Sequence, residues 1–136
     1  MFSNEDPSED PIPFELTPEG QQVLEAARTL RRNLVSYAEA EQEGVIPINA
    51  FKPGVGEMVS VMRKTGVDML LVDDLLDELQ DISERGSTAF HLHFFAGLQP
   101  ETIAKLMQVP ERVAGRDVGI ARAWLFERLK QITEKP

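Results

Sequence analysis

Cysteine is absent from the 136-residue chain, and tryptophan and tyrosine each occur once. Without cysteine the chain can form neither disulfide bonds nor thiolate metal sites, which fits a reducing compartment. No apolar run approaches the roughly 20 residues that a helix needs to cross a membrane. The acidic start, MFSNEDPSED, has neither the basic beginning nor the apolar centre of a secretory signal. These absences predict a cytoplasmic protein with no membrane partner.

Basic residues are also scarce, and their distribution is uneven. The chain has 14 Lys and Arg against 23 Asp and Glu, a net charge of −9. Residues 1–85 carry a net charge of −11, and residues 86–136 carry +2. Because DNA phosphates repel an acidic protein at long range, we expect the isolated chain to bind DNA weakly. The acidic part is interpreted either as a solubilising surface or as a face for a basic protein partner.

Motifs typical of enzymes and metal sites are missing. The sequence has no Gly-rich phosphate loop, no G-x-S-x-G and no recognisable nucleophile–base pair. The acidic row in residues 73–81 lacks the loop spacing of a calcium site. His91 and His93 are two residues apart, so on a helix they point away from each other and cannot share a metal, and we interpret them as surface or rim residues. We therefore predict a non-enzymatic protein without catalytic residues, metal or cofactor.

Apolar spacing and turn residues predict an all-α chain of about six helices, beginning with an acidic N-terminal part. Residues 1–16 are interpreted as a disordered acidic tail, with docking of Phe14 and Leu16 on the body as the alternative. Thr17 followed by Pro18 is typical of a helix start, and this helix should run to about Glu43. Its predicted buried stripe consists of Val23, Ala27, Leu30, Leu34 and Ala38.

The rest of the acidic region, residues 17–82, should hold a connector and two further helices. The connector spans residues 44–54, and a short helix follows at about 55–64. Asp68 then caps a helix from about Met69 to Asp81. Its apolar side is Leu71, Val72, Leu75, Leu76 and Leu79. Its outer side is the acidic row Asp73, Asp74, Asp77, Glu78 and Asp81.

Residues 83–132 predict a unit of three helices separated by tight breaks. The first should run from about Glu84, capped by Ser83, to about Ala96, where Gly97 ends it. We place Phe90 and Phe94 in its core and leave Phe95 partly exposed. The second spans roughly 100–107, and after the break at 108–110 the third runs to about residue 130. A short helix, a tight break and a longer helix form the layout of a helix-turn-helix.

Three runs within residues 84–130 resemble region four of bacterial sigma factors of the extracytoplasmic-function class. Residues 92–99, LHFFAGLQ, correspond to L-R-F-F-G-G-L-S in that family. Glu101, Ala104 and Met107, with the break that follows, correspond to E-x-A-x-x-L-G-I-S. Residues 115–125, GRDVGIARAWL, correspond to K-R-D-W-R-L-A-R-A-W-L. The five residues ARAWL are the most specific part of the resemblance.

The resemblance implies a transcription regulator or initiation protein whose region four contacts promoter DNA, RNA polymerase core or both. Its DNA-binding residues on the third helix would be Arg112, Gly115, Arg116, Gly119 and Arg122. We do not find a complete region two in residues 1–80. The family's Lys, Trp and Arg at positions 115, 118 and 119 are Gly, Val and Gly here, which thins the reading face.

A second hypothesis keeps the helix-turn-helix only as a scaffold. In it, the Gly115/Gly119 face or the acidic row binds protein and not DNA, since a G-x-x-x-G face lets helices approach closely. The partner would be polymerase, another sigma factor or a second copy of the chain. The sequence leaves the oligomeric state open.

Overall fold

The computed structural model describes residues 12–42 and 69–133. In these residues the chain forms five helices and no strand: α1 (Pro18–Gln42), α3 (Met69–Ile82), α4 (Glu84–Phe94), α5 (Pro100–Met107) and α6 (Glu111–Thr133). The predicted all-α class is therefore confirmed. The predicted connector at 44–54, the helix at 55–64 and the cap at Asp68 lie outside the described residues.

Local capping explains where the helices begin and end. The Thr17 hydroxyl accepts a hydrogen bond from the Gly20 amide at 3.0 Å, and the Ser83 hydroxyl accepts one from the Gly86 amide at 2.9 Å. Gly97 has a φ of 76°, the left-handed conformation in which glycine is not strained. It stops α4 as predicted, although the helix already ends at Phe94 and not at Ala96. Helix α5 has the predicted bounds.

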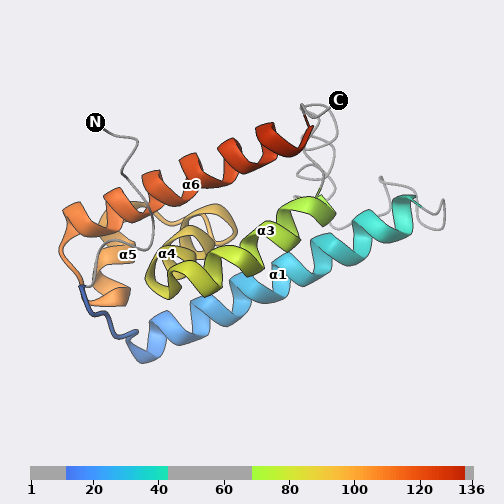
Figure 1. The fold of residues 1–136 in the computed structure, drawn as a ribbon. Coiled ribbons are helices and arrows are strands. Elements are labelled where there is room, and N and C mark those ends of the chain that lie inside the picture. Colours follow the sequence, from blue (N-terminus) through green and yellow to red (C-terminus); the bar gives the residue numbers. More distant parts are fainter. Residues whose placement is uncertain (1–11, 43–68, 134–136) are drawn as a thin grey trace.

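Helix α4 lies at the centre of the described fold and packs against each of the other four helices. In Figure 1, α6 runs along one side of the molecule and α1 along the other, while α3 and α4 lie between them. Helix α5 closes the end where α1 and α6 begin. Because α4 is surrounded, eight consecutive residues from Arg85 to Leu92 are buried.

Two hydrophobic clusters form the core, and α1, α4 and α6 contribute to both. The buried members of the first are Ala27, Leu34, Met69, Val72, Leu75, Leu76, Leu79, Phe90, Phe95, Ala121, Leu125 and Leu129. Those of the second are Leu24, Ala89, Leu92, Ile103, Ala104, Met107, Val109, Val113, Ala114 and Val118. Of the predicted α1 stripe, Ala27 and Leu34 are buried, and Val23, Leu30 and Ala38 are half-buried. Leu24, which was not predicted, is buried beside Val23.

The aromatic and histidine assignments on α4 were partly wrong. Phe90 is buried, but Phe94 is 38 % exposed, and Phe95 is the buried neighbour at 6 %. Phe94 stacks on Phe90 at the rim, with 5.3 Å between ring centroids. His91, predicted at the surface, is 1 % exposed. Helical spacing finds an apolar stripe, but a helix enclosed on all sides also buries its polar faces, and this accounts for His91. Phe94 is the last residue of α4 and lies beyond the fully buried run Arg85–Leu92.

The described part of the predicted tail, residues 12–16, lies against the body. Ile12, Phe14 and Leu16 pack against the second hydrophobic cluster. The docking of Phe14 and Leu16, which the sequence left as an alternative to disorder, is therefore observed. The division into regions 17–82 and 83–132 stays a prediction.

Candidate nucleic-acid interface

One face of α6 carries the residues that the sequence assigned to DNA. Arg112, Arg116, Gly119 and Arg122 are exposed, and Gly115 is half-buried. Their spacing of three or four residues places them on adjacent turns of one side of the helix. The opposite side is buried at Val113, Ile120, Ala121 and Leu125, while Trp124 is half-buried. The structure therefore brings the five predicted residues onto one outward surface.

The two glycines leave this surface shallow. A methyl group added at Gly119 would meet no atom within 4 Å, and one added at Gly115 would lie 3.8 Å from Pro100 Cβ. Neither position thus needs glycine for packing inside the chain. The open space lies outward, where a nucleic acid or protein backbone could approach.

The basic groups on the face differ in their surroundings. The guanidinium of Arg122 lies over the ring of Phe126, 5.5 Å from its centroid, and Phe126 is 47 % exposed. Such a cation–π contact holds the guanidinium along the helix surface. Arg112 lies in the first turn of α6, where the positive end of the helix dipole favours an anion. The face is therefore most suited to phosphate near its N-terminal half.

The break between α5 and α6 is tight and strained at one residue. Gln108 has a φ of 56° and a ψ of 47°, the left-handed conformation in which the resembling family has glycine. Its backbone amide caps α5 by donating to Ala104 O. Val109 is buried in the second cluster, and Pro110 O accepts from the amides of Val113 and Ala114 to begin α6. The break thus fixes how α6 leaves α5.

A buried ion pair holds α6 against α4. The guanidinium of Arg85 donates to both carboxylate oxygens of Asp117, through Nε at 2.6 Å and Nη2 at 2.9 Å. The two side chains are 6 % and 5 % exposed. Nη1 of Arg85 donates to Ile12 O at 2.7 Å. A two-pronged pair in a low-dielectric interior is directional, so it fixes the rotation of α6 about its axis.

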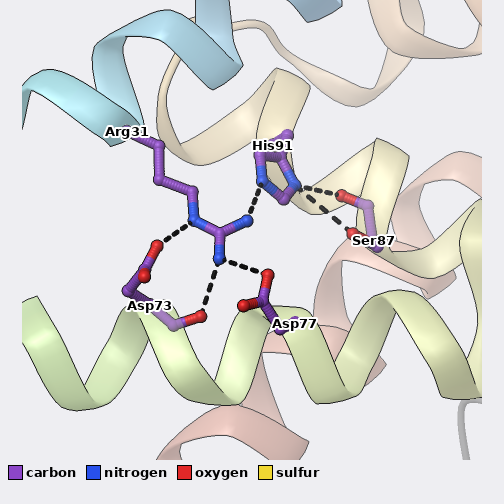
Figure 2. Close-up of polar contacts among 5 residues, drawn as sticks. All are labelled: Arg31, Asp73, Asp77, Ser87 and His91. Atoms are coloured by element: carbon purple, nitrogen blue, oxygen red, sulfur yellow. Dashed lines mark hydrogen bonds and ion pairs between the residues drawn. The ribbon is translucent and has the colours of Figure 1, made fainter. Parts of the chain in front are cut away.

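A second polar cluster joins α1, α3 and α4. Figure 2 shows Arg31 of α1 donating to Asp73 Oδ1 at 2.7 Å, to Asp73 O at 2.7 Å and to Asp77 Oδ1 at 2.8 Å. Its Nη1 lies 3.2 Å from His91 Nε2, and His91 Nδ1 lies 2.8 Å from Ser87 O. Arg31 pairs with acids.

Burial and charge keep His91 neutral. The pKa of His91 is lowered from 6.5 to about 4. Desolvation by burial is the largest cause and the Arg31 and Arg28 charges act in the same direction, while the hydrogen bond with Ser87 O and the Asp77 charge oppose them. A neutral imidazole accepts at one nitrogen and donates at the other. Nε2 can then accept from Arg31 while Nδ1 donates to the Ser87 carbonyl.

A family model described as "ECF sigma factor" matches residues 26–131, more than three quarters of the chain. The chain belongs to the ECF sigma factor family. Such sigma factors are non-enzymatic transcription regulators that act with RNA polymerase and promoter DNA. No curated protein and no solved structure matches the chain. The match reaches well beyond the resemblance at 84–130, since it includes α3 and most of α1.

In this ECF sigma factor, the sequence did not reveal the polar residues that orient α6. In the sequence, Asp117 stands only as part of the run GRDVGIARAWL. A charged residue among apolar neighbours indicates a buried partner, but spacing could not identify it as Arg85, which precedes it by 32 residues. Gln108 stands only as the first residue of the break at 108–110.

The acidic row of this ECF sigma factor is partly used inside the chain. Asp73 and Asp77 bind Arg31, and Glu78 binds Arg128 of α6 at 2.6 Å. A groove of about 430 Å³ between α1 and α3 is lined by Arg28, Arg31, Arg32, Asp73, Asp77 and Gln80. Across residues 12–42 and 69–133, no three His, Asp or Glu side chains form a candidate metal site. None of the helices there is long and apolar enough to cross a membrane.

Proposed function

We propose that this ECF sigma factor contacts promoter DNA through the outward face of α6, with α5 and α6 acting as a region-four helix-turn-helix. The main observation behind this proposal is that Arg112, Arg116 and Arg122 share the exposed side of one long helix, which follows a short helix and a tight break. In this arrangement α6 enters the major groove, and α5 lies across the DNA backbone.

The three arginines would act mainly on phosphates. Arginine binds phosphate through two parallel hydrogen bonds, and such contacts position the helix on DNA without reading sequence. Arg116 lies next to the two glycines and can also reach a guanine edge. Gly115 and Gly119 have no side chains that could contact base edges, so any preference for a DNA sequence would rest on few residues.

The acidic remainder limits DNA binding by the chain alone. With a net charge of −9, the chain repels DNA at long range, so the contact would form on RNA polymerase, in the cytoplasm. We propose that Asp74 and Asp81, the exposed acids of α3 that form no ion pair with residues 12–42 or 69–133, face a basic surface of a protein partner. The chain would work without a complete region two of its own.

The test is fluorescence anisotropy of a labelled DNA duplex titrated with the full chain at several low salt concentrations. Each phosphate contact contributes about 0.9 to the slope of log affinity against log salt. The double variant Arg112→Ala/Arg116→Ala should weaken binding and reduce that slope by about 2. The matched control is Arg32→Ala, an exposed arginine on α1 whose guanidinium binds Thr29. A slope that falls equally in both variants would count against α6 as the interface.

A second candidate is a protein-binding face without DNA contact. The observation favouring it is the exposed Phe126, which continues the open Gly119 surface along the same side of α6. Aromatic side chains beside small residues are typical of helix-docking surfaces. The partner would be polymerase, another sigma factor or a second copy of the chain. Absence of DNA binding at low salt, together with polymerase retention that Phe126→Ala abolishes, would favour this candidate.

A further inference from the structure

The segment that precedes α1 crosses the end of α5 and the break before α6. We call residues 12–17 the N-terminal strap. The Glu15 amide donates to Met107 O at 3.2 Å, and the Thr17 amide donates to Leu106 O at 2.9 Å. The last carbonyls of a helix have no partner within it. At the end of α5, the strap supplies two of the missing donors.

The contacts continue on both sides of these two hydrogen bonds. Gln108 Nε2, at the strained residue of the break, donates to Glu15 O at 2.7 Å. Arg85, which holds Asp117 of α6, donates to Ile12 O at 2.7 Å. The strap therefore bonds to the end of α5, to the break and to the arginine that orients α6.

Helix α1 seats the strap with little clearance. A methyl group added at Gly20 would lie 2.9 Å from Leu106 O, 3.1 Å from Leu16 Cδ2 and 3.2 Å from Leu106 Cβ. The first of these is a backbone atom, which cannot rotate away. Gly20 thus allows the first turn of α1 to rest directly on the last turn of α5.

We infer that residues 12–20 are positioning residues for α6: they set the angle between α5 and α6, although they precede the family match at residues 26–131. The strap bonds to the break and packs against the second hydrophobic cluster, while the arginines of α6 are exposed to solvent. The effect of this positioning on DNA binding rests on the proposed function of α6. The strap can bias the α5–α6 arrangement by no more than the free energy of its own contacts.

The test measures the angle directly, without DNA. Because the chain has no cysteine, Lys105→Cys on α5 and Ala123→Cys on α6 give two unique spin-label sites, both exposed. Double electron–electron resonance should show one narrow distribution of the distance between the two spin labels in the otherwise unchanged chain. Gly20→Ala should shift or broaden it. Gln21→Ala, exposed on the same turn, is the matched control and should leave it unchanged.

A milder pair of variants keeps the test decisive if Gly20→Ala does not fold. Gln108→Met keeps the approximate length of the side chain but has no amide to donate to Glu15 O, so the distance distribution should broaden slightly. Gln108→Lys restores a donor and should narrow it again, which general destabilisation would not predict. Unchanged distances in the folded variants overturn the inference.

DNA binding separates this inference from the proposed function. At fixed salt, Gly20→Ala should bind the labelled duplex about two- to tenfold more weakly, the range that loss of one hydrogen bond covers. If the unmodified chain binds no DNA, the proposed function fails, while the distances still decide whether the strap positions α6. If DNA is bound but Gly20→Ala changes neither distance nor affinity, only the strap inference fails.

Discussion

His91 is a titratable residue that lies almost fully out of contact with water. It is buried in α4 between the Arg31 guanidinium and the Ser87 carbonyl. Protonation would turn its accepting Nε2 into a donor that faces another donor. The neutral ring completes the four-way bonding of Arg31, which ties α1 to α3 and α4.

This burial should make the stability of the protein depend on pH. The folded pKa of His91 is about 4, and the unfolded value is 6.5, so between these values the unfolded chain binds more protons. The stability contribution of neutral His91 is fully present above pH 6.5 and is lost as pH falls toward 4. From pH 7 to pH 5, the free energy of unfolding should fall by about 2 kcal/mol through this group. Urea unfolding at both pH values measures the fall.

Two variants isolate the contribution of His91 from that of the carboxylates. His91→Gln keeps an acceptor for Arg31 but does not titrate, so its stability should fall by about 2 kcal/mol less over the same pH range. His93→Gln, which alters the half-buried second histidine, should retain the full pH dependence. Equal pH dependence in the unmodified chain and His91→Gln would show that His91 is not the group responsible.

Residues that act locally were predictable, and residues that act across the fold were not. Thr17, Ser83 and Gly97 perform the capping roles predicted from their neighbours, because a cap depends on a few adjacent residues. The burial of His91 and the exchange of Phe94 with Phe95 depend on which helices cover α4. That arrangement is not contained in the spacing of α4 itself.

At the scale of elements, α6 carries two glycines that its own packing does not require. Glycine in a helix interior costs about 1 kcal/mol relative to alanine. Because an added methyl at Gly119 meets no atom within 4 Å, Gly119→Ala should raise the melting temperature by about 4 °C. Gly115→Ala should also stabilise, since its methyl would make an ordinary contact with Pro100. Thermal unfolding followed by circular dichroism measures both changes.

The same glycine variants compare stability with binding. If the α6 face meets a DNA or protein surface closely, Gly119→Ala should weaken that contact while it strengthens the helix. A lower melting temperature for Gly119→Ala would contradict the open surroundings of this glycine. A stabilised variant with unchanged affinity would place the contact elsewhere on α6.

Helix boundaries were predicted more accurately than helix neighbours. The bounds of α5 and the start of α6 could be predicted from the residues at their ends, Pro100, Gln108 and Pro110. The five residues of the α6 face came from the family resemblance, and the structure places them on one side of the helix. The strap and the Arg85–Asp117 pair join residues that are distant in sequence, and no local pattern contains them.

At the scale of the whole molecule, α4 joins the two hydrophobic clusters. Phe90 belongs to the first cluster, while Ala89 and Leu92 belong to the second. Helices α1 and α6 also contribute to both clusters. A unit made of α4, α5 and α6 alone would therefore expose apolar surface that α1 and α3 cover. This packing bears directly on the predicted division into regions 17–82 and 83–132.

We expect the described helices to unfold as one cooperative unit, because no cluster can lose its packing without exposing α4. Trp124, the only tryptophan in the sequence, packs against the first cluster and reports on it by fluorescence, while circular dichroism reports on all helices. The two probes should give coincident urea transitions.

Leu92→Ala removes a buried side chain from the second cluster and should lower the free energy of unfolding by about 2–5 kcal/mol. It should shift both transitions equally, although Trp124 lies in the other cluster. Lys105→Ala, exposed on α5, is the control and should shift neither. Separate transitions, or a Leu92→Ala shift seen by circular dichroism alone, would establish two independent domains and return the boundary to residues 82–83.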